Sequence, residues 1–197
     1  MARALALTVV LLLAGCSWTG PRIRAVEPAE WEAALAELRG SPVAVFVWAA
    51  WSRSSVELLP TIVELQREFE PRGVQFLTVC LHDPEDDSAN DAARRLVRRL
   101  DARFPHYRLK VDYLTAAELV GAASPPALAL FCADGSRVRT LQGEEESDAR
   151  LAPADISDAL EALAEPRDAA DAAGIMTDIP RREEAAQWTE TRSPAGL

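Results

Sequence analysis

The sequence predicts an α/β fold, with helices on both faces of a mixed β-sheet. Continuous apolar segments at 42–49, 73–81 and 126–131 alternate with segments of helical periodicity, as expected for strands buried on both faces. An Asp-Gly pair then separates the last of these segments from 137–143, which predicts a closing antiparallel hairpin. At 197 residues and 49% hydrophobic composition, the chain can form one domain with a substantial core. The predicted fold class is therefore a three-layer α/β/α sandwich with a mixed central sheet.

The first four elements are two helices and two strands in alternation. The segment "EPAEWEAALAELRG" (27–40) has apolar residues at helical spacing and ends in glycine, so it predicts a helix. The apolar run "PVAVFVWA" (42–49) predicts a buried strand, and 54–70 predicts a helix with one apolar side. The second buried strand is expected at "GVQFLTVCL" (73–81).

The remaining elements are shorter, apart from one charged helix. We expect that helix at 86–103, a short strand at "HYRLKVD" (106–112) and a short helix at 115–122. After the hairpin, 153–165 predicts a closing helix, with a proline in the first turn, where proline is favoured. From there on, 166–197 is rich in alanine, charge and proline without apolar periodicity, which predicts a disordered tail.

The N-terminal stretch "MARALALTVVLLLAGCSWTG" predicts an export signal and not a part of the fold. A basic start at Arg3 precedes an apolar run that is too short for an ordinary spanning helix. Its end, Leu13-Ala14-Gly15-Cys16, resembles a bacterial lipobox. That resemblance implies a lipoprotein signal peptide at 1–15, a diacylglycerol on Cys16 and a tether at 16–25. Serine after the cysteine favours the outer membrane, facing the periplasm, if the cell is Gram-negative. The alternative is an ordinary secretory signal with a chance cysteine.

Composition excludes several classes of function. The net charge is -10, from 31 acidic and 21 basic residues, and no basic stripe is evident, which argues against a nucleic-acid partner. The chain has 3 cysteines and 2 histidines, too few and too scattered for a zinc site. We therefore expect no metal and no cofactor.

The segment "VFVWAAWSRSSVELLP" (45–60) resembles the active-site segment of thioredoxins. In that family, Trp-Ala-x-Trp precedes Cys-x-x-Cys, and a proline follows inside the active-site helix. In this register Ser52 stands at the position of the attacking cysteine and Ser55 at that of the resolving cysteine. Downstream, "SPPALALF" resembles the segment that carries the family's cis-proline, with Pro126 at the matching position.

The resemblance covers roughly 26–165. An insert at about 84–112 is similar to that of membrane-anchored TlpA- and ResA-like thioredoxins. The family's groove between the active-site corner and the cis-proline loop holds an extended peptide, in the manner of strand addition. The resemblance implies an apolar peptide against Trp51 and Pro126. Pro125 lacks the N–H that this mode would use.

Arg53 adds a positive charge at the start of the predicted helix 54–70. A helix N-terminus favours negative charge, so a carboxylate or phosphate could bind beside Arg53, the alternative being a solvated side chain. The possible partners are thus the membrane, through lipidated Cys16, and an extended peptide or another envelope protein.

The family's catalytic groups are missing from this register. Disulfide exchange requires a thiolate, and a serine hydroxyl cannot form a mixed disulfide. The buried acid of many thioredoxins falls at Phe46, and a glutamate common in TlpA- and ResA-like proteins falls at Leu58. We predict an exported, lipid-anchored thioredoxin-fold protein without oxidoreductase activity. It would be a binding or assembly module in the cell envelope.

Two alternatives rest on other residues. An envelope oxidoreductase of the TlpA and ResA kind could use Cys80 or Cys132. The resemblance places their strands on either side of 42–49, however, roughly 9–10 Å apart and beyond the reach of a disulfide. A serine hydrolase would need a base beside Ser52, and His82 is expected at the same edge of the sheet. The sequence has no Gly-x-Ser-x-Gly elbow to support that activity.

Overall fold

Six strands form one mixed sheet in the computed structural model, which describes residues 21–143 and 151–165. Their order across the sheet is β1 (Ile23–Val26), β4 (His106–Leu109), β3 (Gln75–Cys80), β2 (Val43–Trp48), β5 (Ala127–Phe131) and β6 (Arg137–Gln142). The first four of these are mutually parallel, whereas β5 is antiparallel to β2 and β6 is antiparallel to β5. The predicted mixed sheet and closing hairpin are therefore confirmed.

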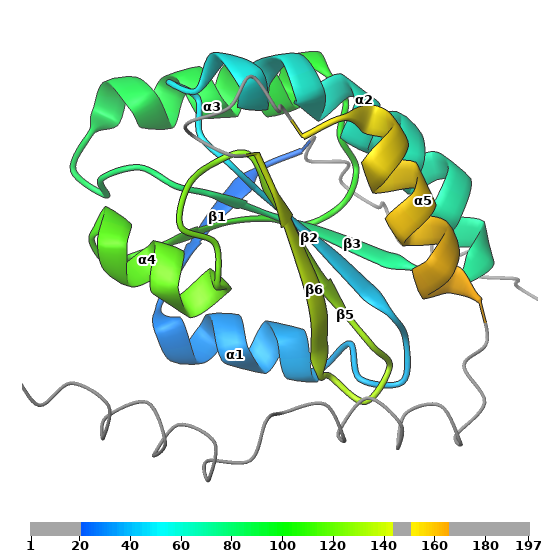
Figure 1. The fold of residues 1–197 in the computed structure, drawn as a ribbon. Helices are drawn as coiled ribbons and strands as arrows, with labels where there is room; N and C mark the ends of the chain where they lie inside the picture. The colour runs from blue at the N-terminus through cyan, green and yellow to red at the C-terminus, as the bar shows by residue number, and fades with distance from the viewer. Residues whose placement is uncertain (1–20, 144–150, 166–197) are drawn as a thin grey trace, which may run out of the picture.

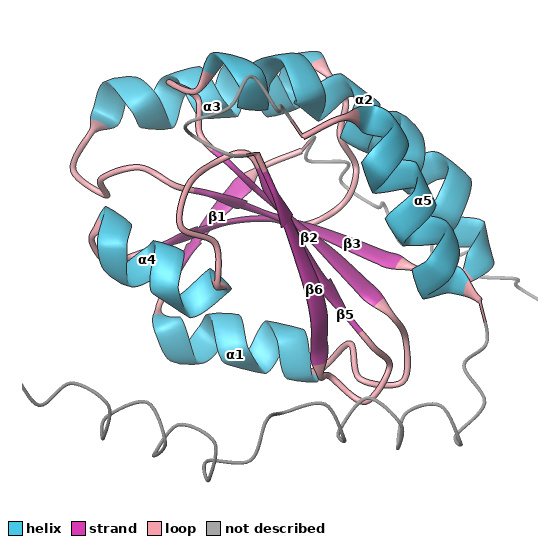
Figure 2. Ribbon diagram, viewed as in Figure 1, coloured by secondary structure: helices cyan, strands magenta, loops and turns pink. Residues whose placement is uncertain are grey.

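The helices lie in two layers, one on each face of the sheet (Figures 1 and 2). One face is covered by α1 (Pro28–Ala36) and α4 (Tyr113–Val120). The other is covered by α2 (Arg53–Phe69), α3 (Asp87–Arg99) and α5 (Pro153–Ala164), with a short 3₁₀ turn at Glu70–Arg72 after α2. The predicted three-layer α/β/α sandwich is thus the observed architecture.

Strand β2 lies at the centre of both cores, which explains its uninterrupted apolar sequence. Val43, Val45 and Val47 pack toward α1 and α4. Ala44, Phe46 and Trp48 pack toward α2, α3 and α5. Full burial of a large apolar side chain stabilises a fold by about 1.5–3 kcal/mol, and Phe46 and Trp48 are completely buried. An acidic side chain at Phe46 would therefore face the main core.

The predicted tether at 16–25 is wrong at its C-terminal end. Ile23–Val26 forms the edge strand β1, which pairs in parallel with β4. Val26 is buried and Ile23 is partly buried, whereas the two residues between them are exposed. A four-residue edge strand with half of its side chains in solvent gives no apolar run, so periodicity does not reveal it. The first described strand therefore begins at Ile23, within the predicted tether.

Several predictions fall on residues outside the described ranges. They are the signal peptide at 1–15, lipidation of Cys16 and the tail at 166–197. The predicted insert at about 84–112 is described, and it contains α3 and β4. Among the described residues, no helix combines the length and the apolar character that a membrane crossing requires.

The carboxyl ends of the parallel strands define one edge of the sheet, and the candidate site lies there. Strand β2 ends at Trp48, and α2 begins a few residues later. The loop that leads into β5 reaches the same edge, because Ala127 pairs with Val47. In open α/β sheets, this edge is where ligands usually bind.

Candidate functional site

Ser52 caps the N-terminus of α2. Its backbone is extended, with φ -83° and ψ 111°, and its Oγ accepts a hydrogen bond from the Ser55 N–H at 3.3 Å. Ser52 Oγ also lies 3.2 Å from the Ser54 hydroxyl. Serine is among the residues that best satisfy the unpaired N–H groups of a first helical turn. The residue that the resemblance aligns with the attacking cysteine is therefore a helix cap.

Ser55, which the resemblance aligns with the resolving cysteine, is completely buried. Its Oγ and the Nε1 of Trp48 have no hydrogen-bond partner among the described residues. A buried hydroxyl without a partner destabilises a fold by about 1–3 kcal/mol relative to a paired one. No hydrogen bond observed in the described structure therefore requires a serine at position 55.

The loop at residues 121–126 faces the start of α2. The peptide bond between Pro125 and Pro126 is cis, as predicted, and both prolines are half-buried. Gln142 fixes the loop by donating from Nε2 to the Ser124 carbonyl at 3.1 Å and to the Ser124 hydroxyl at 3.0 Å. The Ser52 hydroxyl lies 3.5 Å from the Pro125 carbonyl oxygen. The structure thus brings Ser52 and the predicted cis-proline together.

An exposed aromatic surface lies beside these residues. Trp51 is 59% exposed, and its ring centroid lies 6.2 Å from that of Tyr113, the first residue of α4. Leu114 follows and is 75% exposed. Sequence reasoning missed Tyr113 and Leu114, because it began the helix at 115. Asp112, which caps α4 through the Thr115 N–H, is the signal that gives the correct start.

Arg53 forms an ion pair within the first turn of α2. Its Nε lies 2.7 Å from Oε1 of Glu57. The hydrogen bond from this carboxylate raises the pKa of the exposed guanidinium above its ordinary value. The positive charge that could attract an external anion is therefore already paired with a carboxylate of the same helix.

Cys80, at the end of β3, belongs to a buried chain of hydrogen bonds. Its Sγ lies 3.2 Å from Nδ1 of His82, and Nε2 of His82 lies 2.7 Å from Oδ1 of Asn90. An amide oxygen only accepts, so Nε2 carries the proton and Nδ1 accepts from the Cys80 thiol. Asn90 was not identified from the sequence, since it lies in the polar first turn of a charged helix.

This chain of groups does not activate the cysteine. Cys80 is 1% exposed, and burial raises the pKa of its thiol to about 12, against a weaker opposing hydrogen bond from the Ala50 backbone. A nucleophilic cysteine requires the thiolate form and access to its substrate. Burial also lowers the pKa of His82. Because both ring nitrogens of His82 face Cys80 and Asn90, His82 is not positioned as a base for Ser52.

Cys132 lies at the other end of the sheet, just after β5. Strand β2 pairs with β3 at Trp48 and Cys80, but it pairs with β5 at Val43 and Phe131. The two cysteines therefore lie on opposite sides of β2 and at opposite ends of it. Neither cysteine forms a disulfide bond in the described structure. The prediction that these cysteines form no disulfide with each other is confirmed.

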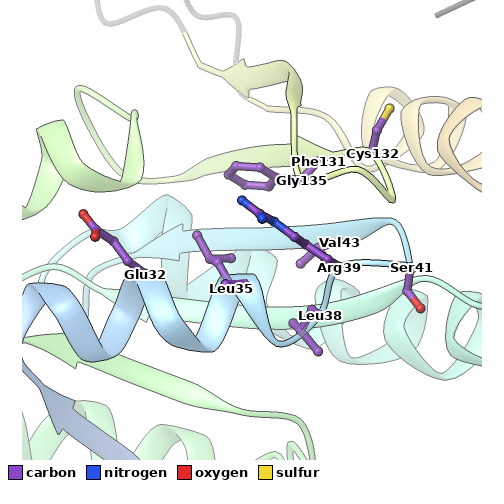
Figure 3. A pocket seen from close by; sticks show the side chains of 10 residues that line it. Glu32, Leu35, Leu38, Arg39, Ser41, Val43, Phe131, Cys132 and Gly135 are labelled. Atoms are coloured by element: carbon purple, nitrogen blue, oxygen red, sulfur yellow. The ribbon is translucent and has the colours of Figure 1, made fainter.

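A cavity of about 320 Å³ lies at the Cys132 end, between α1 and the β5–β6 turn (Figure 3). Its walls include Leu35, Leu38 and Phe131, with the Arg39 side chain extending across it. The Cys132 sulfur points away from these side chains (Figure 3). Since this cavity is at the opposite end of β2 from Ser52, it is separate from the candidate site. Within 21–143 and 151–165, no cluster of three or more histidine, cysteine or acidic side chains could hold a metal.

Comparison with known proteins identifies the fold. No protein-family model matches the sequence, and no curated protein matches it. A secreted Mycobacterium tuberculosis disulfide oxidoreductase, described as homologous to E. coli DsbE, matches with a TM-score of 0.51 and 16% identity, over 65% of this chain and 86% of that one. The chain has a thioredoxin-like fold.

Two further structures agree with the thioredoxin-like assignment. A thioredoxin-family thiol:disulfide interchange protein from Chlorobium tepidum TLS matches with a TM-score of 0.50 and 15% identity, over 66% of this chain and 84% of that one. An uncharacterized conserved protein from Geobacillus kaustophilus matches with a TM-score of 0.53 and 21% identity, over 68% and 72% respectively. At these identities, the comparisons show the fold and nothing beyond it.

Proposed function

We propose that this protein is a non-catalytic binding or assembly module of the cell envelope, built on a thioredoxin-like fold. One observation carries the proposal. Ser52, which caps α2, and Ser55, which is completely buried, stand where the motif resemblance expects the redox pair. Neither hydroxyl can form a mixed disulfide. This chain shares the fold of structures that are named as oxidoreductases. The two residues proposed to occupy its redox positions contain no sulfur.

The binding surface that we propose consists of Trp51, Tyr113, Leu114 and the Pro125–Pro126 loop. Trp51 and Leu114 expose large apolar surface at the edge of the sheet where the loop lies. Exposed aromatic side chains are frequent anchors of binding sites. We propose an extended apolar peptide segment of another envelope protein as the ligand.

The bound peptide would depend on side-chain contacts more than on backbone pairing. Pro125 has no N–H to donate, and its carbonyl oxygen already faces the Ser52 hydroxyl at 3.5 Å. Each missing backbone hydrogen bond weakens binding by about 0.5–1.5 kcal/mol. Strand addition is therefore the weaker component, and burial of Trp51 and Leu114 is the stronger one.

The envelope location is part of the proposal and rests on the sequence. The signal-like stretch ends in Leu-Ala-Gly-Cys, which resembles a lipobox. We propose that Cys16 carries the lipid and that the domain follows it after a short tether. Several acyl chains anchor a protein stably, whereas one alone gives marginal binding.

An insulin-reduction assay with dithiothreitol tests the non-catalytic proposal. We expect the protein to leave the rate of insulin precipitation unchanged, with an ordinary thioredoxin as positive control. Stimulation of the rate would refute the proposal. If stimulation occurred, Cys80→Ala and Cys132→Ser variants would show whether either cysteine carries the activity.

A further inference from the structure

The second half of α3 concentrates positive charge within an otherwise acidic chain. Between Asp91 and Arg103, five arginines stand against two aspartates, a net charge of +3, whereas the whole chain carries -10. Asp91 pairs with Arg94 at 3.5 Å, and Asp101 pairs with Arg103 at 2.7 Å. For Arg95, Arg98 and Arg99, no ion pair occurs within the part of the chain that the structure describes.

These arginines share one exposed side of the helix. At 100° per residue, the four side chains at 94, 95, 98 and 99 lie within an arc of about 140°. All four are exposed, whereas Ala93, Leu96 and Val97 are buried in the core beneath. We call the four arginines the α3 basic face. Its charges lie close together, and those of Arg95, Arg98 and Arg99 have no carboxylate partner among the described residues.

A hollow of about 390 Å³ lies between the α3 basic face and the start of α2. Arg95 and Arg99 line it, one helical turn apart. The rest of its lining is apolar and consists of Ala50, Val56, Ala92 and Leu96. Guanidinium groups bind phosphate oxygens through paired N–H donors. Two arginines beside an apolar lining suit a ligand in which a phosphate group is attached to an apolar group.

The position of β1 brings this face near the proposed lipid anchor. Ile23 packs into the core that contains Leu96 and Val97, so β1 begins under α3 (Figure 1). Ile23 lies seven positions after Cys16, and a fully extended chain spans at most about 25 Å over seven such steps. A lipid on Cys16 would therefore hold the α3 basic face within a short distance of the membrane surface.

We infer that the α3 basic face binds the phosphate headgroups of anionic phospholipids and holds this side of the domain against the membrane. The inference rests on the proposed anchor only for the orientation of the domain. Electrostatic forces decay over about 8 Å at physiological salt. The net charge of +3 between Asp91 and Arg103 therefore dominates the interaction of this side of the domain with the bilayer.

Binding to vesicles tests the inference without the lipid anchor. The chain from Ser17 to Leu197 retains every described strand and helix. It is mixed with vesicles of phosphatidylcholine alone, or of phosphatidylcholine and phosphatidylglycerol in equal parts, and sedimented at about 0.15 M salt. We expect sedimentation only with the anionic vesicles. The triple variant Arg95→Gln/Arg98→Gln/Arg99→Gln should bind at least about tenfold more weakly, since each basic residue near such a surface contributes about fivefold.

A matched control removes the same charge elsewhere. Arg67→Gln/Arg137→Gln/Arg139→Gln also removes three exposed arginines, from α2 and from the edge strand β6. We expect this variant to bind anionic vesicles as the unmodified chain does. Equal weakening in both triple variants, or no binding to either kind of vesicle, would overturn the inference. Binding to an acidic polypeptide such as polyglutamate, but not to the vesicles, would overturn it in favour of a protein ligand. None of these outcomes bears on whether Cys16 is lipidated.

Discussion

The Ser52 hydroxyl and the Pro125 carbonyl oxygen lie 3.5 Å apart, across the space between the start of α2 and the cis-proline loop. In a thioredoxin-like fold, the attacking sulfur and a peptide acceptor would be expected at these two positions. Here one hydroxyl both caps a helix and faces that acceptor. The two groups of the site therefore interact with each other, which is consistent with a site that does not turn over disulfides.

The double variant Ser52→Cys/Ser55→Cys separates the loss of sulfur from the remodelling around it. A helix N-terminus lowers the pKa of a thiol, typically to about 3.5–7.5 in such motifs, so we expect the pair to oxidise to a disulfide. Insulin reduction should remain slow, because Phe46 and Leu58 supply no acid for proton transfer and Pro125 supplies no N–H. Thiol titration and the insulin assay measure the two properties. Turnover equal to that of an ordinary thioredoxin would show that only the sulfurs are missing.

Two single variants distinguish the roles of the serines. Ser52→Ala removes the cap of α2 and should lower the free energy of unfolding by about 1 kcal/mol. Ser55→Ala removes a buried hydroxyl that has no partner among the described residues, so we expect an unchanged or higher stability. Urea denaturation compares both variants with the parent chain. Marked destabilisation by Ser55→Ala would mean that its hydroxyl is hydrogen-bonded after all.

The chain Cys80–His82–Asn90 should be structural. Replacing Asn90 by alanine leaves a buried imidazole N–H without its acceptor and should destabilise the fold by about 1–3 kcal/mol. Local loosening should also speed the reaction of Cys80 with iodoacetamide, measured in a Cys132→Ser background. Asp91→Ala, on the exposed side of the same helix, is the control and should change neither property. A faster thiol reaction in that control would point to general opening of α3.

His106 should make the fold sensitive to acid. Its Nε2 donates to the Ala102 carbonyl at 3.0 Å, and its Nδ1 accepts from the Thr78 hydroxyl at 2.7 Å. Burial lowers the pKa of His106 from 6.5 to about 4. The unfolded chain therefore binds this proton first. The contribution to stability is complete above pH 6.5 and is lost as the pH falls toward 4.

The lowered pKa of His106 corresponds to a loss of at most about 3 kcal/mol in the free energy of unfolding at low pH. Carboxylates titrate in the same range, so the measurement is a comparison of two pH profiles. The free energy of unfolding of a His106→Gln variant should fall less between neutral pH and pH 4 than that of the parent chain. Parallel profiles would remove His106 as a source of acid sensitivity.

The proposed anchor predicts that Cys16→Ser abolishes lipidation. Metabolic labelling with a radioactive fatty acid, followed by immunoprecipitation, should mark the parent protein and not the variant. Equal labelling of both proteins would contradict a lipid on Cys16.

The sequence revealed the central strands because burial on both faces leaves a continuous apolar run. Strand β2 is the clearest case, with all six residues buried. Strand β1 gave no such run, because as an edge strand it buries only part of its side chains. A four-residue edge strand with one fully buried side chain is therefore too short for periodicity to detect.

The candidate site was only partly predictable. The positions of Ser52, Ser55 and the cis-proline followed from a resemblance between motifs, and the structure places them at one edge of the sheet. The hydrogen bond between His82 and Asn90 depends on how the loop after β3 leads into the first turn of α3. Exposure of Leu114 likewise depends on where α4 begins. Local patterns carry no information about such contacts.

The separation of Cys80 and Cys132 has a consequence for biogenesis. In an oxidising compartment, exported proteins often wait for an oxidase or isomerase to join the correct thiols. The described fold needs no such step, because its two thiols lie at opposite ends of β2 and one is buried. If the protein is exported as proposed, its maturation should proceed at the same rate in cells that lack disulfide-forming enzymes.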